Sequence, residues 1–163
     1  MVLHASGIAV RYLMLVLGSR SSHLLTPFAM NTIWITNADY ARLHLLVLSH
    51  RLQFGNGPVE ALNHELRRAE RVAATDILPD VVTMNSRVRL RDLHSDAQLE
   101  ITLVYPQYAD VKAGKISILA PVATAVLGCR VGDKVSWPLP KGTAKYWLEA
   151  ILYQPEAIGD FSS

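Results

Sequence analysis

The sequence predicts an α+β protein with a short N-terminal antiparallel helical hairpin, followed by a twisted antiparallel sheet that packs against one short helix. Apolar residues recur at steps of three and four in residues 31–76, as in amphipathic helices, and alternate with polar residues in residues 77–163, as in strands. A linker ending at Pro79 separates the two patterns, because the residue before a proline is pushed toward extended conformations. We therefore expect a hairpin in 31–76 and a sheet domain in 77–163.

The hairpin is predicted from two helical patterns and the break between them. The first helix is expected from about Ala38 to Leu52, with Thr36 or Asn37 as its N-cap. The glycines that follow must end it, and Pro58 suits the first position of a second helix. In that helix an apolar a/d stripe two heptads long predicts a short coiled coil, formed by Val59, Leu62, Leu66, Ala69 and Ala73.

The sheet is predicted from six segments in which apolar and polar residues alternate or β-branched residues cluster. They are residues 81–84, 87–91, 99–105, 116–118, 134–137 and 144–153. Arg87, Arg89 and Arg91 alternate with apolar residues, so their side chains share one face of a strand. A solvated outer face is the first interpretation of these arginines, and a surface for an anionic partner is the alternative.

The stretch from Lys115 to Asp133 organises this second part. Its strand ends before Pro121, which has no N–H to donate and suits the first turn of a helix. A short apolar helix is expected from Val122 to Leu127, with Gly128 at its left-handed end. A turn at residues 131–133 then starts the next strand.

Composition narrows the function classes. The formal net charge of the 163 residues is +2, from sixteen Lys and Arg and fourteen Asp and Glu, which gives no general argument for binding nucleic acid. Cys129 is the one cysteine, so an intramolecular disulfide and a multi-cysteine zinc site are excluded and a cytoplasmic location is expected. A structural role is the first interpretation of this lone cysteine, and a thiol pKa lowered by the neighbouring Arg130 is the alternative.

No metal or nucleotide site is predicted. The six histidines are scattered, and His64-Glu65 is followed by Arg68 where a zinc-protease motif needs its second histidine. Gly55 and Gly57 lack the third glycine and the lysine of a phosphate-binding loop.

Residues 1–30 differ in composition from the rest and hold an apolar run from Ile8 to Leu17. This run is shorter than the roughly 20 residues that span a bilayer, and no signal-peptide cleavage site follows it. We interpret residues 1–30 as an upstream extension that is not native to the regular part opening at Met30, with an amphipathic surface segment as the alternative.

The stretch from Lys115 to Asp133 resembles the signature of the C-terminal domain of the GreA/GreB transcript-cleavage factors, in which a strand, a proline, a short helix and a V-G-D turn follow in this order. Residues 80–160, which begin Asp80-Val81-Val82-Thr83-Met84 and end with Tyr153-Gln154-Pro155-Glu156-Ala157 before Asp160, are more similar still to the Rnk group of Gre-related proteins, which bind RNA polymerase. The resemblance covers about residues 31–160 and implies an FKBP-like fold for residues 77–163.

The resemblance also implies a docking surface for RNA polymerase. In Gre proteins the segment between the strand and the short helix contacts the rim of the secondary channel on the polymerase β′ subunit. Carried over to this chain, the contact residues are Leu119, Ala120, Pro121, Val122 and Ala125. GreB-like sequences have Asp at the position of Leu119, so docking would be more apolar here. Turning the chain and filling the core is the alternative role for these residues.

The predicted hairpin tip lacks the chemistry of a cleavage factor. In Gre factors two tip carboxylates help to hold a catalytic magnesium ion, whereas the tip here carries Arg51, Gln53, Phe54, Gly55 and Asn56, with Glu60 as a lone acid nearby. The resemblance thus implies a regulator that occupies the channel rim and competes with Gre factors without catalysis. We expect a monomer with no cofactor, metal, membrane contact or direct sequence-specific contact with nucleic acid.

Two other functions are weighed against this one. The first is a peptidyl-prolyl isomerase, because the implied fold is shared with the FK506-binding proteins; its pocket would need an aromatic lining from Tyr105, Tyr108, Trp137, Tyr146, Trp147 and Tyr153. The second is a Gre factor competent in cleavage, which the tip composition disfavours.

Overall fold

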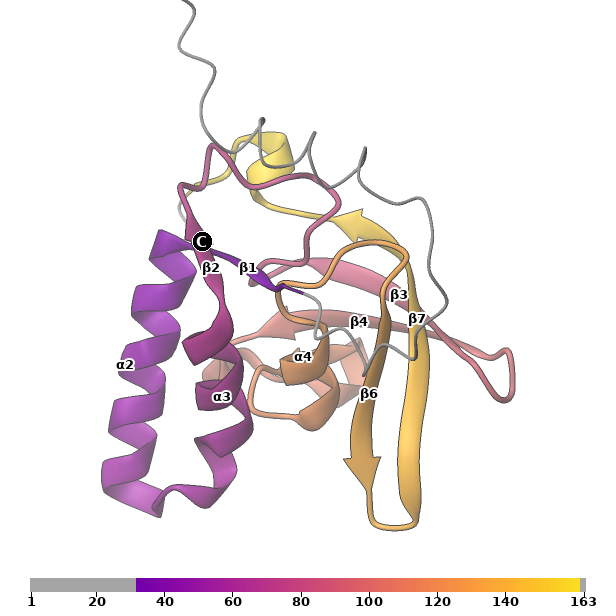
Figure 1. Ribbon diagram of the computed structural model, residues 1–163, viewed down its shortest axis with the longest axis horizontal. Coiled ribbons are helices and arrows are strands. Elements are labelled where there is room, and N and C mark those ends of the chain that lie inside the picture. The colour runs from indigo at the N-terminus through magenta and orange to yellow at the C-terminus, as the bar shows by residue number, and fades with distance from the viewer. Residues whose placement is uncertain (1–31, 162–163) are drawn as a thin grey trace, which may run out of the picture. The chain divides into compact units, whose positions relative to one another are not determined.

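The computed structural model describes residues 32–161, and its N-terminal part is a helical hairpin (Figure 1). Helix α2 (Asn37–Phe54) is capped by Thr36, whose Oγ1 accepts a hydrogen bond of 3.0 Å from the Asp39 N–H. Gly55 ends α2 with a φ of 81°, and a short 3₁₀ turn (Gly57–Val59) leads into α3 (Glu60–Arg68). The hairpin confirms the sequence prediction. The predicted extension 1–30 lies outside the described residues.

The second helix is shorter than predicted. It ends at Arg68, and Glu70–Val72 forms strand β2, which pairs in parallel with β1 (Trp34–Thr36). The Glu70 N–H donates to the Ile33 carbonyl at 2.9 Å, so the backbone beyond Ala69 pairs with a strand instead of continuing the helix. The predicted a/d stripe therefore stops at Leu66, and its extension to Ala73 was wrong.

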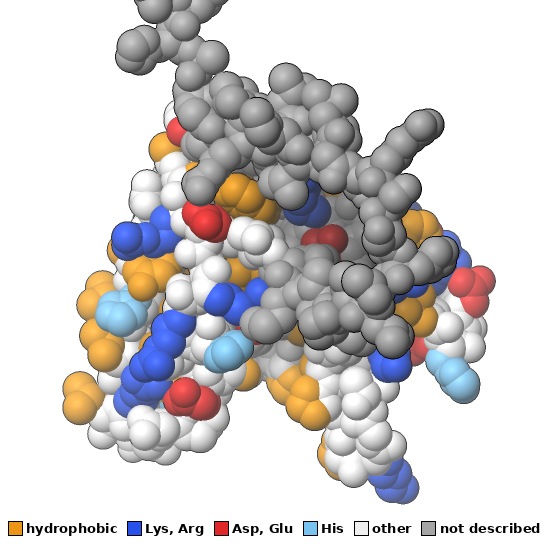
Figure 2. All heavy atoms as spheres, viewed as in Figure 1, with side chains coloured by type: hydrophobic (Ala, Val, Ile, Leu, Met, Phe, Trp, Pro, Cys, Tyr) orange, Lys and Arg blue, Asp and Glu red, His pale blue; other side chains and the backbone are white. Residues whose placement is uncertain are grey.

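Helix α2 is apolar on two opposite sides. Leu43 and Val47 are fully buried against the rest of the chain, whereas Leu45, Leu48 and Leu52 are exposed. Figure 2 shows hydrophobic side chains along the outer edge of the hairpin, where α2 lies. A helix in a single-domain protein normally exposes a polar outer face, so this apolar outer side needs an explanation.

The C-terminal part is a curled five-stranded sheet with the strand order β5-β4-β3-β7-β6. Its strands are β3 (Arg87–Asp92), β4 (Gln98–Val104), β5 (Lys115–Ser117), β6 (Lys134–Leu139) and β7 (Gly142–Tyr153). Neighbouring strands are antiparallel except β4 and β5, which are parallel, so the sheet is mixed. Two register shifts between β3 and β7 add local twist. With the short helix α4 (Pro121–Val126), this arrangement confirms the α+β class.

Residues 81–84 do not form the predicted strand. Val81 makes one isolated bridge to Arg130, and the rest of the segment is irregular. Its apolar side chains are nonetheless buried, because its backbone pairs with the equally irregular segment after α4: the Val82 N–H donates to the Cys129 carbonyl and the Gly128 N–H to the Val82 carbonyl, both at 2.9 Å. The cluster of apolar and β-branched residues in this segment predicted burial correctly and strand pairing incorrectly.

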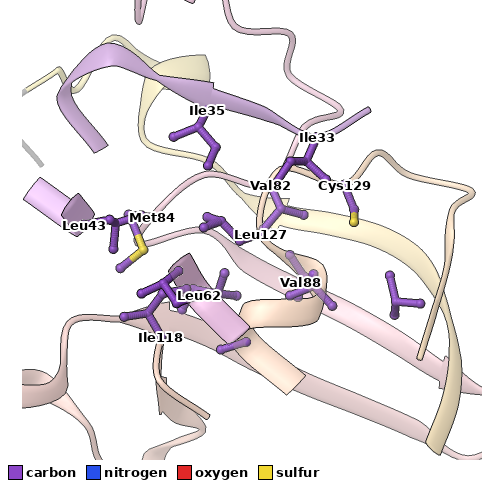
Figure 3. Packing of buried hydrophobic residues seen from close by; sticks show 14 of the residues in the cluster. Ile33, Ile35, Leu43, Leu62, Val82, Met84, Val88, Ile118, Leu127 and Cys129 are labelled. Atoms are coloured by element: carbon purple, nitrogen blue, oxygen red, sulfur yellow. The ribbon is translucent and has the colours of Figure 1, made fainter. Parts of the chain in front are cut away.

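One hydrophobic core joins the hairpin to the sheet. Figure 3 shows side chains from both parts packed together, including Ile33, Ile35, Leu43, Leu62, Val82, Met84, Val88, Ile118, Leu127 and Cys129. The side chains of Leu43 and Leu62 come from the two hairpin helices, and Val88 comes from the sheet. The hairpin is therefore held by hydrophobic burial against the sheet as well as by the chain connection.

Gly128 occupies the closest approach between the two parts. Its φ is 73°, and its carbonyl accepts a 3.0 Å hydrogen bond from the Trp34 N–H. A Cβ at this position would lie 2.8 Å from the Ile33 Cβ and 2.9 Å from the Trp34 backbone nitrogen. Only glycine satisfies both the left-handed backbone and the contact.

We predict that Gly128→Ala destabilises the fold by about 3 kcal/mol or more, because strain and crowding add. Gly159→Ala is the matched control: Gly159 has a similar φ of 79° but nothing within 4 Å of its would-be Cβ. This control should lose only about 1 kcal/mol. Urea unfolding of both variants measures the difference, and equal losses would show that the contact with Ile33 and Trp34 contributes nothing.

Candidate partner-binding site

The connector between β5 and α4 is held by short-range hydrogen bonds. Ile118 is fully buried, and its N–H donates to the Val104 carbonyl at 2.8 Å, which continues the parallel ladder by one residue. The Leu119 N–H then donates to the Ser117 Oγ at 3.2 Å and the Ala120 N–H to the Ser117 carbonyl at 2.8 Å. These bonds turn the chain sharply away from the sheet.

Helix α4 starts where the sequence predicts, at its proline. Ala120 is extended, with φ −73° and ψ 141°, and Pro121 is the first helical residue. The Thr124 Oγ1 donates to the Ile118 carbonyl at 2.6 Å, so the helix is tied back to the strand that precedes it. The helix covers residues 121–126, within one residue of the predicted bounds.

Five apolar residues at the start of α4 are the ones predicted to dock RNA polymerase. We call them the rim surface: Leu119, Ala120, Pro121, Val122 and Ala125. Pro121 is exposed and the other four are half-buried. Leu119, Val122 and Ala125 also pack against the core, so these three residues have a structural role. None of the five side chains of the rim surface is ionisable.

The hairpin tip presents apolar and amide groups. Leu52 and Phe54 are 89% and 66% exposed, and Gln53, Gly55 and Asn56 are exposed as well. The His50 and Phe54 rings pack with their centroids 4.6 Å apart.

The lone acid near the tip is already paired. The Arg51 Nη2 donates to the Glu60 Oε2 at 3.0 Å, which joins the end of α2 to the start of α3. In the described part of the chain, no group of three or more His, Cys, Asp or Glu could hold a metal ion. The tip thus provides a cross-helix ion pair in place of a carboxylate cluster.

A buried carboxylate at the junction of hairpin and sheet was missed by sequence reasoning. Asp39 is 3% exposed, and its Oδ2 accepts a 3.1 Å hydrogen bond from the Met84 N–H, 45 residues away. The pKa of Asp39 is raised from 3.8 to about 6, chiefly by desolvation. The Glu156 carboxylate also raises this pKa, whereas the Met84 N–H, Thr36 and Arg42 lower it. The available signal was an acid three residues after an N-cap threonine, which normally indicates only a helix start.

Beside this junction lies a groove of about 670 Å³ between α2 and the 3₁₀ turn Pro106–Tyr108. Arg42, Leu45 and Leu46 contribute from α2, and Tyr105 and Tyr108 from the other side. Burial raises the pKa of Tyr105 to about 12, so its hydroxyl stays protonated at neutral pH. The groove was not predicted, because it needs two segments about sixty residues apart in the chain.

The three alternating arginines are used within the sheet. Arg87 and Arg89 both donate to Glu100, at 2.7 and 2.8 Å, and Arg91 pairs with Glu149 and Asp96. Hydrogen bonds from Arg89 and then Arg87 hold the pKa of Glu100 below its ordinary value. The face is a network of ion pairs, which supports the solvated-surface interpretation.

The thiol of Cys129 is not activated. The side chain is 6% exposed, and burial raises its pKa to about 12, with the Asp133 and Glu65 charges adding to the effect. A thiol pKa lowered by Arg130, the alternative considered from the sequence, is wrong, because desolvation outweighs the lowering that comes from Arg68. Cys129 is a core residue.

The aromatic residues considered for an isomerase pocket do not line a single pocket. Tyr105 and Tyr108 line the groove, whereas Trp137 and Tyr146 stack on each other with centroids 4.9 Å apart. Trp137 is 8% exposed and belongs to the core. Tyr146 and Trp147 are successive residues of β7 and therefore point to opposite faces of the sheet.

No helix in residues 32–161 is long and apolar enough to cross a membrane.

Comparison with known proteins identifies both parts of the chain. The family profile "Rnk N-terminus" matches residues 31–72, and "Transcription elongation factor, GreA/GreB, C-term" matches residues 77–153. The "Regulator of nucleoside diphosphate kinase" of Escherichia coli (strain K12) is 44% identical over 133 residues, which are 80% of this chain and 96% of that protein. "Transcription elongation factor GreA" of Pelobacter propionicus is 35% identical over 118 residues, 72% of each chain.

A solved structure agrees with these matches. The "Prokaryotic transcription elongation factor GreA/GreB from Nitrosomonas europaea" superposes with a TM-score of 0.62 at 41% identity, over 76% of this chain and 99% of that chain. The chain therefore belongs to the GreA/GreB family of transcription elongation factors. Within that family it is a homologue of the Rnk proteins, whose N-terminal profile it carries.

Asp39 leads to a prediction about pH. Its pKa is about 6 in the folded chain and near 3.8 in the unfolded chain, so its favourable contribution is complete below pH 3.8 and is lost as the pH rises through 6. At neutral pH the buried carboxylate destabilises the fold by up to about 3 kcal/mol relative to a neutral side chain. Asp39→Asn, whose amide oxygen can still accept from Met84, should be more stable than wild type at about pH 7.5.

The same difference should shrink to about a third of its full size at about pH 4.5 and disappear near pH 3, where Asp39 is neutral in both the folded and the unfolded chain. Urea unfolding of wild type and Asp39→Asn at several pH values measures it, with the exposed Asp76→Asn as the matched control. A less stable Asp39→Asn at pH 7.5, with a gap that does not change with pH, would contradict the assignment.

Proposed function

We propose that this protein binds RNA polymerase through the rim surface and occupies the rim of the secondary channel on the β′ subunit. The observation that carries the proposal is the match of residues 77–153 to the GreA/GreB C-terminal family, at whose strand–proline–helix signature the rim surface lies. An exposed proline beside half-buried apolar side chains suits an interface anchor, because such groups lose little entropy on binding.

The hairpin would then enter the channel entrance and compete with Gre factors without chemistry of its own. This part of the proposal rests on the tip, where Glu60 is held by Arg51 and the other tip residues are apolar, amide or glycine. A magnesium ion needs several oxygen ligands in octahedral geometry, which one paired carboxylate does not provide. We expect a cytoplasmic, monomeric regulator with no catalytic activity and no cofactor.

Binding to core RNA polymerase tests the docking surface. Leu119→Arg and Pro121→Ala should each weaken binding, Leu119→Arg by at least about tenfold, or ~1.4 kcal/mol, because a charge would be placed in an apolar contact. Leu139→Asp is the matched control, since Leu139 is 51% exposed and lies on β6. A purified GreA should displace the wild-type protein. Undiminished binding of Leu119→Arg, or no competition with GreA, would refute the proposed site.

A transcript-cleavage assay tests the passive role of the tip. Wild-type protein should leave the cleavage rate of stalled complexes unchanged and should lower the rate produced by GreA. Gln53→Glu with Asn56→Asp restores two tip carboxylates and avoids Gly55, whose φ of 81° disfavours a side chain. Cleavage by this double variant would show that charge was the missing element, whereas cleavage by wild type would refute a passive tip.

A further inference from the structure

The outer side of α2 carries an apolar stripe, which we define as Ala38, Ala41, Leu45, Leu48 and Leu52. These residues follow steps of three and four, and with 100° of rotation per residue all five lie within about 40° of the direction opposite Leu43. Leu43 is fully buried, so the stripe faces directly away from the core. All five side chains are exposed, and Leu45 and Leu52 are 65% and 89% exposed.

The stripe continues into the groove. Leu45 belongs to both, and Leu46 and Arg42 line the groove on the next rows of α2, facing Tyr105 and Tyr108. The groove lining mixes these apolar and aromatic side chains with polar ones from Ser49, Asn85 and Gln107. An apolar helix row beside an amphipathic groove is an arrangement that receives an amphipathic helix in proteins. The stripe spans 14 residue steps, or about 21 Å of helix axis, which a partner helix of about 15 residues would cover.

The charged residues around this surface indicate the charge that a partner helix should carry. Arg42 is exposed and lines the groove, where it interacts with Asp39 and Tyr105. Helix α2 carries no exposed acid, because its one carboxylate, Asp39, is 3% exposed. A second copy of this chain that packs stripe against stripe would therefore add a second Arg42 and no exposed acid of α2, because Arg51 is already paired with Glu60. An acidic helix would instead place carboxylates opposite Arg42 and leave its apolar row on the stripe.

We propose that the stripe and the adjoining groove form a docking site for an acidic amphipathic helix of a partner protein. This site is separate from the rim surface: α3 contacts both α2 and α4 and lies between them (Figure 1). The protein then has two binding surfaces and can join two partners, or two elements of one partner. The apolar character of both sides of α2 follows from this, since one side is buried on folding and the other on binding.

The test uses the full chain and a designed peptide as the probe. The peptide has about 18 residues, with leucine at the a and d heptad positions, glutamate on the flanks and a fluorescein label; a matched peptide has lysine in place of glutamate. Fluorescence anisotropy should show that the glutamate peptide binds at least tenfold more tightly than the lysine peptide. Its affinity should fall as salt concentration rises.

Variants locate the site. The double variant Leu45→Ser with Leu48→Ser should lower the affinity for the glutamate peptide at least tenfold. Arg42→Gln should also lower this affinity and should reduce its dependence on salt concentration. Leu139→Ser, with a similarly exposed leucine on β6, and the rim variant Pro121→Ala should bind as wild type does. Thermal unfolding should show that each variant folds as the wild type does, because the substituted positions are exposed.

Three results would overturn the proposal. Equal affinities for the two peptides would show that the partner helix need not be acidic. Undiminished peptide binding by the double serine variant would show that the stripe is not the binding site. Sedimentation should show a monomer. A dimer that dissociates on Leu48→Ser would identify a second copy of the chain as the occupant instead. None of these outcomes depends on whether the rim surface binds RNA polymerase.

Discussion

The structure depends on the close backbone contact at Gly128. Its carbonyl accepts from Trp34 at the start of the hairpin, and its N–H donates to Val82 in the segment before the sheet. Three distant parts of the chain thus meet where a side chain has no room, with Ile33 Cβ only 2.8 Å from the would-be Cβ. Because α4 ends just before Gly128, this contact also sets where the rim surface lies relative to the hairpin.

Charged side chains in this protein mostly stabilise the fold or each other. Glu60 pairs with Arg51 across the hairpin, and Glu100 pairs with two arginines across β3 and β4. The two surfaces that we propose to bind partners are apolar: the rim surface at α4 and the stripe on α2. A protein built in this way is suited to occupying a site on a partner, because apolar contact provides affinity without the ionised groups that hydrolysis requires.

The junction of hairpin and sheet combines a hydrophobic core with one buried carboxylate. Leu43 and Leu62 pack against the sheet domain, and Asp39 accepts the backbone N–H of Met84 among them. The hydrogen bond satisfies a buried donor, while desolvation raises the pKa of Asp39 to about 6. The orientation of the hairpin on the sheet is therefore held by directional and non-directional contacts together, and the directional one is sensitive to pH.

The sequence by itself determined the local structure: the helix caps and breaks at Thr36 and Gly55, the start of α4 at Pro121, most of the strands and the absence of tip carboxylates. These features depend on backbone preferences and short-range patterns. The tertiary structure alone decided that residues 70–72 pair with β1, that residues 81–84 are buried without being a strand, and that Cys129 and Asp39 have raised pKa values. It also decided which side of α2 is buried, because burial and desolvation depend on which distant segments pack together.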